Sequence, residues 1–459
     1  MANKFRKIID SGDSIKDILY YWFPEMISNT MLISLPPLID AYIVASLKST
    51  MTYGALGMAN NFLHVLIKLA EAIPVAAIVT VGRHNGAKRY ESCGKNLGDT
   101  FWTTTFIGIV LASLIFFNSE NIFRWLGVPE HMVSLGVPFL RLKSVVILLI
   151  FISLGFFAFM RGVKNTRTPM IIYSISMIVF IFFDWTLVLG KFGFNKMGLM
   201  GSGIASIIQY CIIILISIWY ITTKKEYKKY FTKIFFLRFS TKRVYRILNL
   251  SWPIMIDKGS LAVSYVWLSK MIAPMGKYAI VTFDVIKNLE RCAILPAVGF
   301  AQIIIFLVSN RLGAQDPDGA KSNIKKVMII TALMLTVTLS FLCLFSKNLV
   351  GLFDPNMEFS YLAAPALVII SMLVILDFVQ LILAGSLRGA GDVKTVMLAR
   401  VCCFGLFFTP TVYIISKLPI QNEITKFVML YGSFYVTTGL VGIIFLWRIK
   451  TPKWQNKKI

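Results

Sequence analysis

The hydrophobic positions of this chain fall into long, uninterrupted runs that are separated by short polar segments. A helix of about 20 apolar residues crosses the roughly 30 Å hydrocarbon core of a bilayer. The pattern therefore predicts membrane-spanning helices. The twelve expected spans are residues 17–44, 53–80, 97–117, 137–160, 169–190, 199–221, 249–273, 279–309, 327–346, 361–386, 396–416 and 427–448.

Several sequence landmarks near the ends of these spans recur at a constant separation of 227 positions. Independent landmarks that share one offset indicate an internally duplicated chain. The matched positions are Arg161-Gly162 with Arg388-Gly389, Thr168 with Thr395, and Gly86-Ala87 with Gly313-Ala314.

The duplication predicts two similar bundles joined by a linker. The expected fold is an all-α polytopic membrane protein, with twelve helices in two pseudo-symmetric six-helix bundles around a central cavity. The regions are an N-tail at 1–16, an N-terminal bundle at 17–221, a linker at 222–248, a C-terminal bundle at 249–448 and a C-tail at 449–459.

Composition agrees with this class, since 57% of residues are hydrophobic, only 15% are charged and the net charge is +25. The basic residues gather in the two tails, the linker and alternate loops. Cytoplasmic loops attract Lys and Arg, so both termini are predicted to be cytoplasmic. The six cysteines show no CxxC spacing. We therefore expect neither a disulfide nor a cysteine metal site.

The linker is the most basic segment of the chain. Its Lys and Arg residues alternate with Tyr and Phe, which is typical of an amphipathic connector on an anionic lipid surface and not of a nucleic-acid site. The basic positions are Lys224, Lys225, Lys228, Lys229, Lys233, Arg238, Lys242, Arg243 and Arg246.

Three acids lie within the predicted spans, where ionisable groups are costly and usually functional. Asp40 follows Pro36-Pro37, which should bend the helix and free backbone carbonyls beside the carboxylate. Asp184 lies among aromatic residues, and Asp377 lies in an apolar helix. Each is a candidate cation-binding group. Alternatively, Asp40 caps a broken helix, and Asp184 extends to external water.

Further polar groups inside the spans are auxiliary candidates. Two Lys-to-Glu pairs at i, i+3, Lys68 with Glu71 and Lys287 with Glu290, favour structural pairing over direct substrate contact. The auxiliary set is Asp257, Asp284, Glu290, Glu71, Lys68, Lys287 and Gln380.

The chain contains no GxSxG, P-loop or HExxH motif, so we expect neither an enzyme nor a cofactor beyond a coupling ion. Buried acids in two repeats, without a nucleotide-binding motif, favour a secondary transporter.

The motifs resemble those of the multidrug and toxic-compound extrusion (MATE) transporters. Residues 38–44 around Asp40 and residues 295–314 resemble helix 1 and helix 8 of that family. Asp377, with Gln380 and Ser386-Leu387-Arg388-Gly389, resembles the NorM-type bacterial branch. The resemblance implies a cavity that opens to one side at a time, through which organic cations or drugs are expelled by a monomer in exchange for Na⁺ or H⁺.

Individual residues carry over from this resemblance. Asp377 matches the acid of a Na⁺ site in the second bundle, and Asp40 and Asp184 match acids of a cation site in the first. Phe180 stands where the family has Asn, and Leu261 where the NorM-type branch has an acid. Asp257, one turn before Leu261, is the candidate substitute.

Two other functions remain open from the sequence. A lipid-linked oligosaccharide flippase of a related fold would need a basic cavity for pyrophosphate. The intramembrane residues Lys68, Lys258, Lys287 and Arg291 permit it. A membrane-embedded enzyme would need converging catalytic groups, which the three scattered histidines do not supply.

Overall fold

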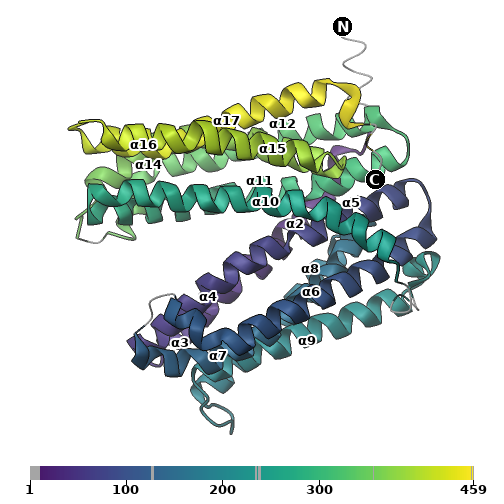
Figure 1. The fold of residues 1–459 in the computed structure, drawn as a ribbon, viewed down its shortest axis with the longest axis horizontal. Coiled ribbons are helices and arrows are strands. Elements are labelled where there is room, and N and C mark those ends of the chain that lie inside the picture. The colour runs from purple at the N-terminus through teal and green to yellow at the C-terminus, as the bar shows by residue number, and fades with distance from the viewer. Residues whose placement is uncertain are drawn as a thin grey trace. The chain divides into compact units, whose positions relative to one another are not determined.

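A computed structural model describes residues 11–125, 129–232, 235, 239–354, 356–455 and 457. Within these ranges every regular element is a helix (Figure 1), which confirms the predicted fold class. Eleven helical segments in the described residues are long and apolar enough to cross a membrane. The remaining expected span, 249–273, lies in α10 (Thr241–Ile272), which carries several charged residues.

The first half of the chain supplies the helices that precede the linker. They are α2 (Ile15–Asn29), the π-helical turn η1 (Thr30–Ser34), α3 (Leu35–Ala45), α4 (Thr50–Ala70), α5 (Ala72–Gly86), α6 (Tyr90–Trp125), α7 (Glu130–Gly162), α8 (Arg167–Leu189) and α9 (Leu199–Thr223), with the short helix η2 (Lys225–Tyr230) in the linker.

The second half repeats this series with additional breaks. After α10 come η4 (Ala273–Met275), α11 (Lys277–Gly313), α12 (Pro317–Leu344), α13 (Ser346–Gly351), α14 (Ser360–Gly389), α15 (Val393–Cys402), the π-helical turn η5 (Cys403–Phe408), α16 (Thr409–Lys417), α17 (Glu423–Lys450) and η6 (Pro452–Trp454).

Backbone geometry recurs at the same offset as the sequence landmarks. The residues that cap α5 and α11, Ala87 and Ala314, both have φ −76° and ψ 4°. The residues after them, Lys88 and Gln315, both adopt a left-handed conformation, with φ of 57° and 60°. The duplicated sequence therefore forms the same turn twice, in spite of different side chains.

The helices form two compact units. The first unit is Phe23–Ser251, and the second unit combines the described residues up to Trp22 with the chain from Trp252 onward. The division falls inside two helices. The beginning of α2 belongs to the second unit and its remainder to the first. The beginning of α10 belongs to the first unit and its remainder to the second.

Specific contacts hold the start of α2 in the second unit. The Asp13 carboxylate accepts hydrogen bonds from Asn323 Nδ2 at 2.7 Å and Arg311 Nε at 3.2 Å. Trp22 Nε1 donates to the Pro296 carbonyl at 3.0 Å, and its ring stacks on Phe300 at 4.9 Å between centroids. The beginning of α2 and the residues just before it are thus bound within the second unit.

The start of α10 is held in the first unit in the same manner. The buried carboxylate of Asp99, on α6, accepts a hydrogen bond from the Ser240 backbone N–H at 2.8 Å and pairs with the guanidinium of Arg243. Arg243 was assigned to the linker as a lipid-facing charge, but in the structure it neutralises a buried acid.

Two local features shape the helices that carry the candidate acids. The π-helical turn η1 lies immediately before Pro36-Pro37, so the helix irregularity expected before Asp40 is present. On α14, Gly385 and Gly389 pack so closely on α11 that an added Cβ would lie 2.6 Å and 2.5 Å from the carbonyl oxygens of Ala301 and Ile305. This close packing fixes α14 beside α11.

Part of the linker is also packed. Tyr227 is buried, and its hydroxyl accepts a hydrogen bond from Asn165 Nδ2 at 2.9 Å. The ammonium of Lys229 lies over the rings of Tyr90 and Tyr230, at 4.8 Å and 5.0 Å from their centroids. Two of the basic linker positions, Lys233 and Arg238, lie outside the described residues.

Candidate cation-binding sites

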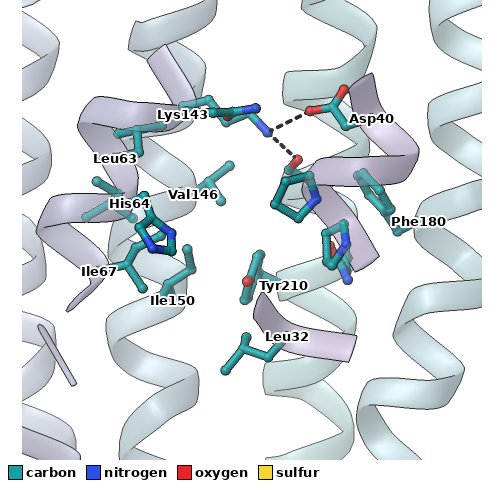
Figure 2. A pocket seen from close by; sticks show the side chains of 16 residues that line it. Leu32, Asp40, Leu63, His64, Ile67, Lys143, Val146, Ile150, Phe180 and Tyr210 are labelled. Carbon is teal, nitrogen blue, oxygen red and sulfur yellow. Dashed lines mark hydrogen bonds and ion pairs between the residues drawn. The ribbon is translucent and has the colours of Figure 1, made fainter. Parts of the chain in front are cut away.

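Asp40 is buried in the first unit and faces a lysine from another helix. Its side chain projects from α3, and its Oδ2 lies 3.8 Å from Nζ of Lys143 on α7 (Figure 2). The same ammonium donates to Ser206 Oγ, on α9, at 2.8 Å. Asp40 Oδ1 has no hydrogen-bond partner among the described residues. One carboxylate oxygen is therefore paired and the other remains available.

A cavity of about 110 Å³ lies beside this pair in the first unit. Its wall is mixed, with apolar side chains alternating with amide, hydroxyl and imidazole groups. The polar lining residues are Asp40, Asn60, His64, Lys143, Ser206, Gln209 and Tyr210, and Phe180 is among the apolar ones. The cavity thus combines apolar side chains with one pair of opposite charges.

Asp184 lies on α8 and is completely buried. Neither of its carboxylate oxygens has a hydrogen-bond partner among the described residues. The alternative that this acid extends to external water does not fit its burial. An unpartnered carboxylate in an apolar interior is strongly disfavoured in the charged form, which suits a group that binds a proton.

In the second unit, Asp377 begins a chain of hydrogen-bonded polar groups. Gln380 Nε2 donates to Asp377 Oδ1 at 2.9 Å. Gln380 Oε1 accepts from Arg400, on α15, and Arg400 Nη1 donates to Asp257 Oδ1 at 2.8 Å. Arg388, at the end of α14, pairs with the other oxygen of Asp257. The candidate ion site is thus connected through one amide to an ion cluster at the end of α14.

This arrangement separates the roles of the two acids. Asp257 is fully buried and is neutralised by two guanidinium groups, which occupy both of its oxygens. It is therefore poorly placed to complete a Na⁺ site, the role suggested for it from the sequence. Asp377 is contacted by the neutral amide of Gln380, so its charge has no direct ion-pair partner among the described residues.

The remaining auxiliary residues divide into surface pairs and one buried acid. Lys68 pairs with Glu71 at 3.0 Å, as predicted. The predicted Lys287–Glu290 pair is wrong, because Lys287 pairs with Asp284 at 2.8 Å. Glu290 is 3% exposed and accepts hydrogen bonds from the hydroxyls of Tyr435, at 2.7 Å, and Tyr431 on α17.

Lys143 and Arg400 are the functional candidates that sequence reasoning missed. Both lie within predicted spans, and an intramembrane base is itself a signal of function. Their importance becomes apparent only when the tertiary structure brings Lys143 to Asp40 and Arg400 to Asp257.

Membrane-length helices in a repeated arrangement, with buried ionisable groups in both units, define a polytopic membrane protein with an architecture that many transporters share. The profile of the MatE family matches residues 26–186 and 253–414, which is more than half of the chain. The chain therefore belongs to the MatE family, as the Asp377 segment predicted, and it is a transporter and not an enzyme.

Individual relatives agree over most of the chain. The probable multidrug resistance protein NorM of Mannheimia succiniciproducens is 22% identical over 420 residues, 91% of this chain and 90% of that protein. NorM of Vibrio cholerae is 24% identical over 379 residues, 82% of each chain. The crystal structure of the Vibrio cholerae MATE transporter VcmN in the bent form has a TM-score of 0.86 at 14% identity, covering 96% of this chain and 98% of its own.

Proposed function

We propose that this chain is a secondary active antiporter that exports organic cations or drugs in exchange for Na⁺ or H⁺ by alternating access. Its relatives with multidrug resistance names support the substrate class. The observation that carries ion coupling is Asp377, an acid in a membrane-length helix whose described hydrogen-bond partner is a neutral amide. A cation that binds there lowers the cost of burying an acid that has no direct ion-pair partner among the described residues.

Na⁺ at Asp377 is the proposed driving ion, with H⁺ at Asp40 and Asp184 as the alternative. In everted vesicles that accumulate a fluorescent organic cation, Na⁺ added at fixed pH is expected to release the substrate. Na⁺ that binds one of the two states, inward-open or outward-open, more tightly than the other shifts the population toward that state. The substrate is released because the favoured state binds it less tightly.

The vesicle assay separates the two ions. A pH gradient imposed in Na⁺-free medium serves as the comparison, and full export under that gradient alone would assign coupling to the proton and to Asp40 and Asp184. The same vesicles with Asp377→Asn should lose the Na⁺ response.

We further propose a bacterial inner-membrane location with both termini and the linker in the cytoplasm, and a monomeric transporter. Replacing Lys224, Lys225 and Lys228 with Gln should weaken contact with the inner leaflet and lower the amount of correctly inserted protein, because each basic residue near an anionic surface contributes about 1 kcal/mol. The drug profile should not change at equal expression. Labelling of a cysteine introduced in the linker measures the orientation, and an altered drug profile would contradict a purely topological role.

The flippase alternative receives less support from the same geometry. It requires free basic groups for a pyrophosphate. Two of the four cations that keep this alternative open, Lys68 and Lys287, pair with acids on their own helices. These two cations are already neutralised by neighbouring carboxylates.

A further inference from the structure

The acid site of the first unit contains a positive charge supplied by the chain itself. Asp40, Asp184 and Lys143 are all less than 9% exposed, and Asp184 interacts electrostatically with both of the other groups, so this site buries two carboxyls and one ammonium. His64 and Tyr210 also line the adjoining cavity from α4 and α9. With Lys143 charged, one further positive charge is sufficient to neutralise the site.

The position of the ammonium is fixed from three sides. Nζ of Lys143 is 3.8 Å from Asp40 Oδ2, 2.8 Å from Ser206 Oγ and 5.1 Å from the centroid of the Phe139 ring. These contacts come from α3, α9 and α7 itself. The lysine head group is therefore held at the carboxylate and is not extended into solvent.

An alkali-metal ion at Asp40 would have to share this location. The ion would lie within a few ångströms of the ammonium, and two like charges at about 4 Å repel strongly when they are shielded from water. The ion would also lack the amide oxygen that an Asn at position 180 would supply, because Phe180 lines the cavity there. Both features disfavour Na⁺ at this place.

We propose that Lys143 is a specificity-determining residue of the first unit. Its ammonium is a tethered cation that takes the place of an alkali-metal ion at Asp40. The charge that the first unit still accepts is then a proton on Asp184, and Na⁺ binding is confined to Asp377 in the second unit. This inference rests on the proposed cation coupling and specifies which ion each unit takes.

Equilibrium binding of ²²Na⁺ to the purified full-length protein tests the proposal without measuring transport. In the otherwise wild-type protein, Asp40→Asn should leave Na⁺ binding unchanged. Lys143→Met keeps an unbranched side chain without charge and should create an Asp40-dependent Na⁺ site. The affinity for Na⁺ at Asp40 should be at least about tenfold higher than in the wild-type protein, because the repelling charge is gone. Lys143→Arg, which keeps the charge, should create none.

Several outcomes would overturn the proposal. Loss of Na⁺ binding in Asp40→Asn alone would show that Na⁺ already binds beside the lysine. The absence of new binding in a Lys143→Met protein that elutes as a monodisperse species and unfolds cooperatively would show that the lysine does not exclude the ion. If Lys143→Met does not fold, the Asp40→Asn comparison still decides. Failure of the proposed function would appear separately, as absence of ion-driven export with these binding results intact.

Discussion

Asp377→Asn is expected to abolish gradient-driven export while the protein remains folded in the membrane. Asn has nearly the same size as Asp and still accepts the hydrogen bond from Gln380, but it carries no charge to bind a cation. Exchange of one monovalent cation for one monovalent organic cation moves no net charge, so the concentration gradient of the coupling ion supplies the driving force, and a tenfold gradient contributes about 1.4 kcal/mol, equivalent to about a tenfold accumulation ratio. The variant should lose this whole contribution.

The measurement is export of a fluorescent cation at matched expression. Asp284→Asn is the matched control, since Asp284 is also an acid in a membrane-length helix but its side chain is 58% exposed and pairs with Lys287 on the same helix. We expect near wild-type export from the control. Substantial export by Asp377→Asn would remove Asp377 from the coupling mechanism.

The second large effect is expected at Asp257, where Asp257→Asn should destabilise the fold. The substitution leaves the guanidinium groups of Arg388 and Arg400 without their carboxylate in the interior of the second unit. Removal of one partner from a buried ion cluster typically costs about 3–5 kcal/mol. We therefore expect a lower Tm and less folded protein, not a selective loss of ion response.

Thermal unfolding in detergent measures this effect. The double variant Asp257→Leu with Arg400→Met should recover part of the lost stability, because it removes a buried charge of each sign together. An unchanged Tm for Asp257→Asn, or a Tm for the double variant below that of Asp257→Asn, would contradict the assigned role of the cluster.

The spans and the repeat were predictable because both depend on local sequence. A run of apolar residues long enough to cross a bilayer has few alternatives to a helix, because the backbone must satisfy its own hydrogen bonds in lipid. The offset of 227 was visible at Gly86-Ala87 and Gly313-Ala314, and the turns at these places have matching backbone geometry.

The pairing of charges was predictable only within a helix, and even there incompletely. Lys68 and Glu71 pair as their spacing indicated. Lys287 has an acid at three positions on either side, and spacing alone does not distinguish Asp284 from Glu290. The choice depends on the two tyrosine hydroxyls of α17 that bind Glu290, and their proximity is a property of the tertiary fold.

The partners of the buried acids also depend on the tertiary fold. Lys143 is 103 positions from Asp40 in the sequence, and Arg400 is 143 positions from Asp257. No local pattern relates residues that far apart. The sequence therefore identified acids at membrane depth but could not identify which bases neutralise them. The proposed roles, Asp257 as a structural acid and Asp377 as an ion ligand, rest on these tertiary contacts.

Direct exchange in proteoliposomes that contain only the purified protein tests the central claim, that a cation gradient drives export through this chain. A Na⁺ gradient imposed at equal pH should move a fluorescent organic cation in the opposite direction, and a Na⁺ ionophore should abolish the movement. Movement of the organic cation that is unaffected when both the Na⁺ and the pH gradients are dissipated, or no movement under either gradient, would contradict the account.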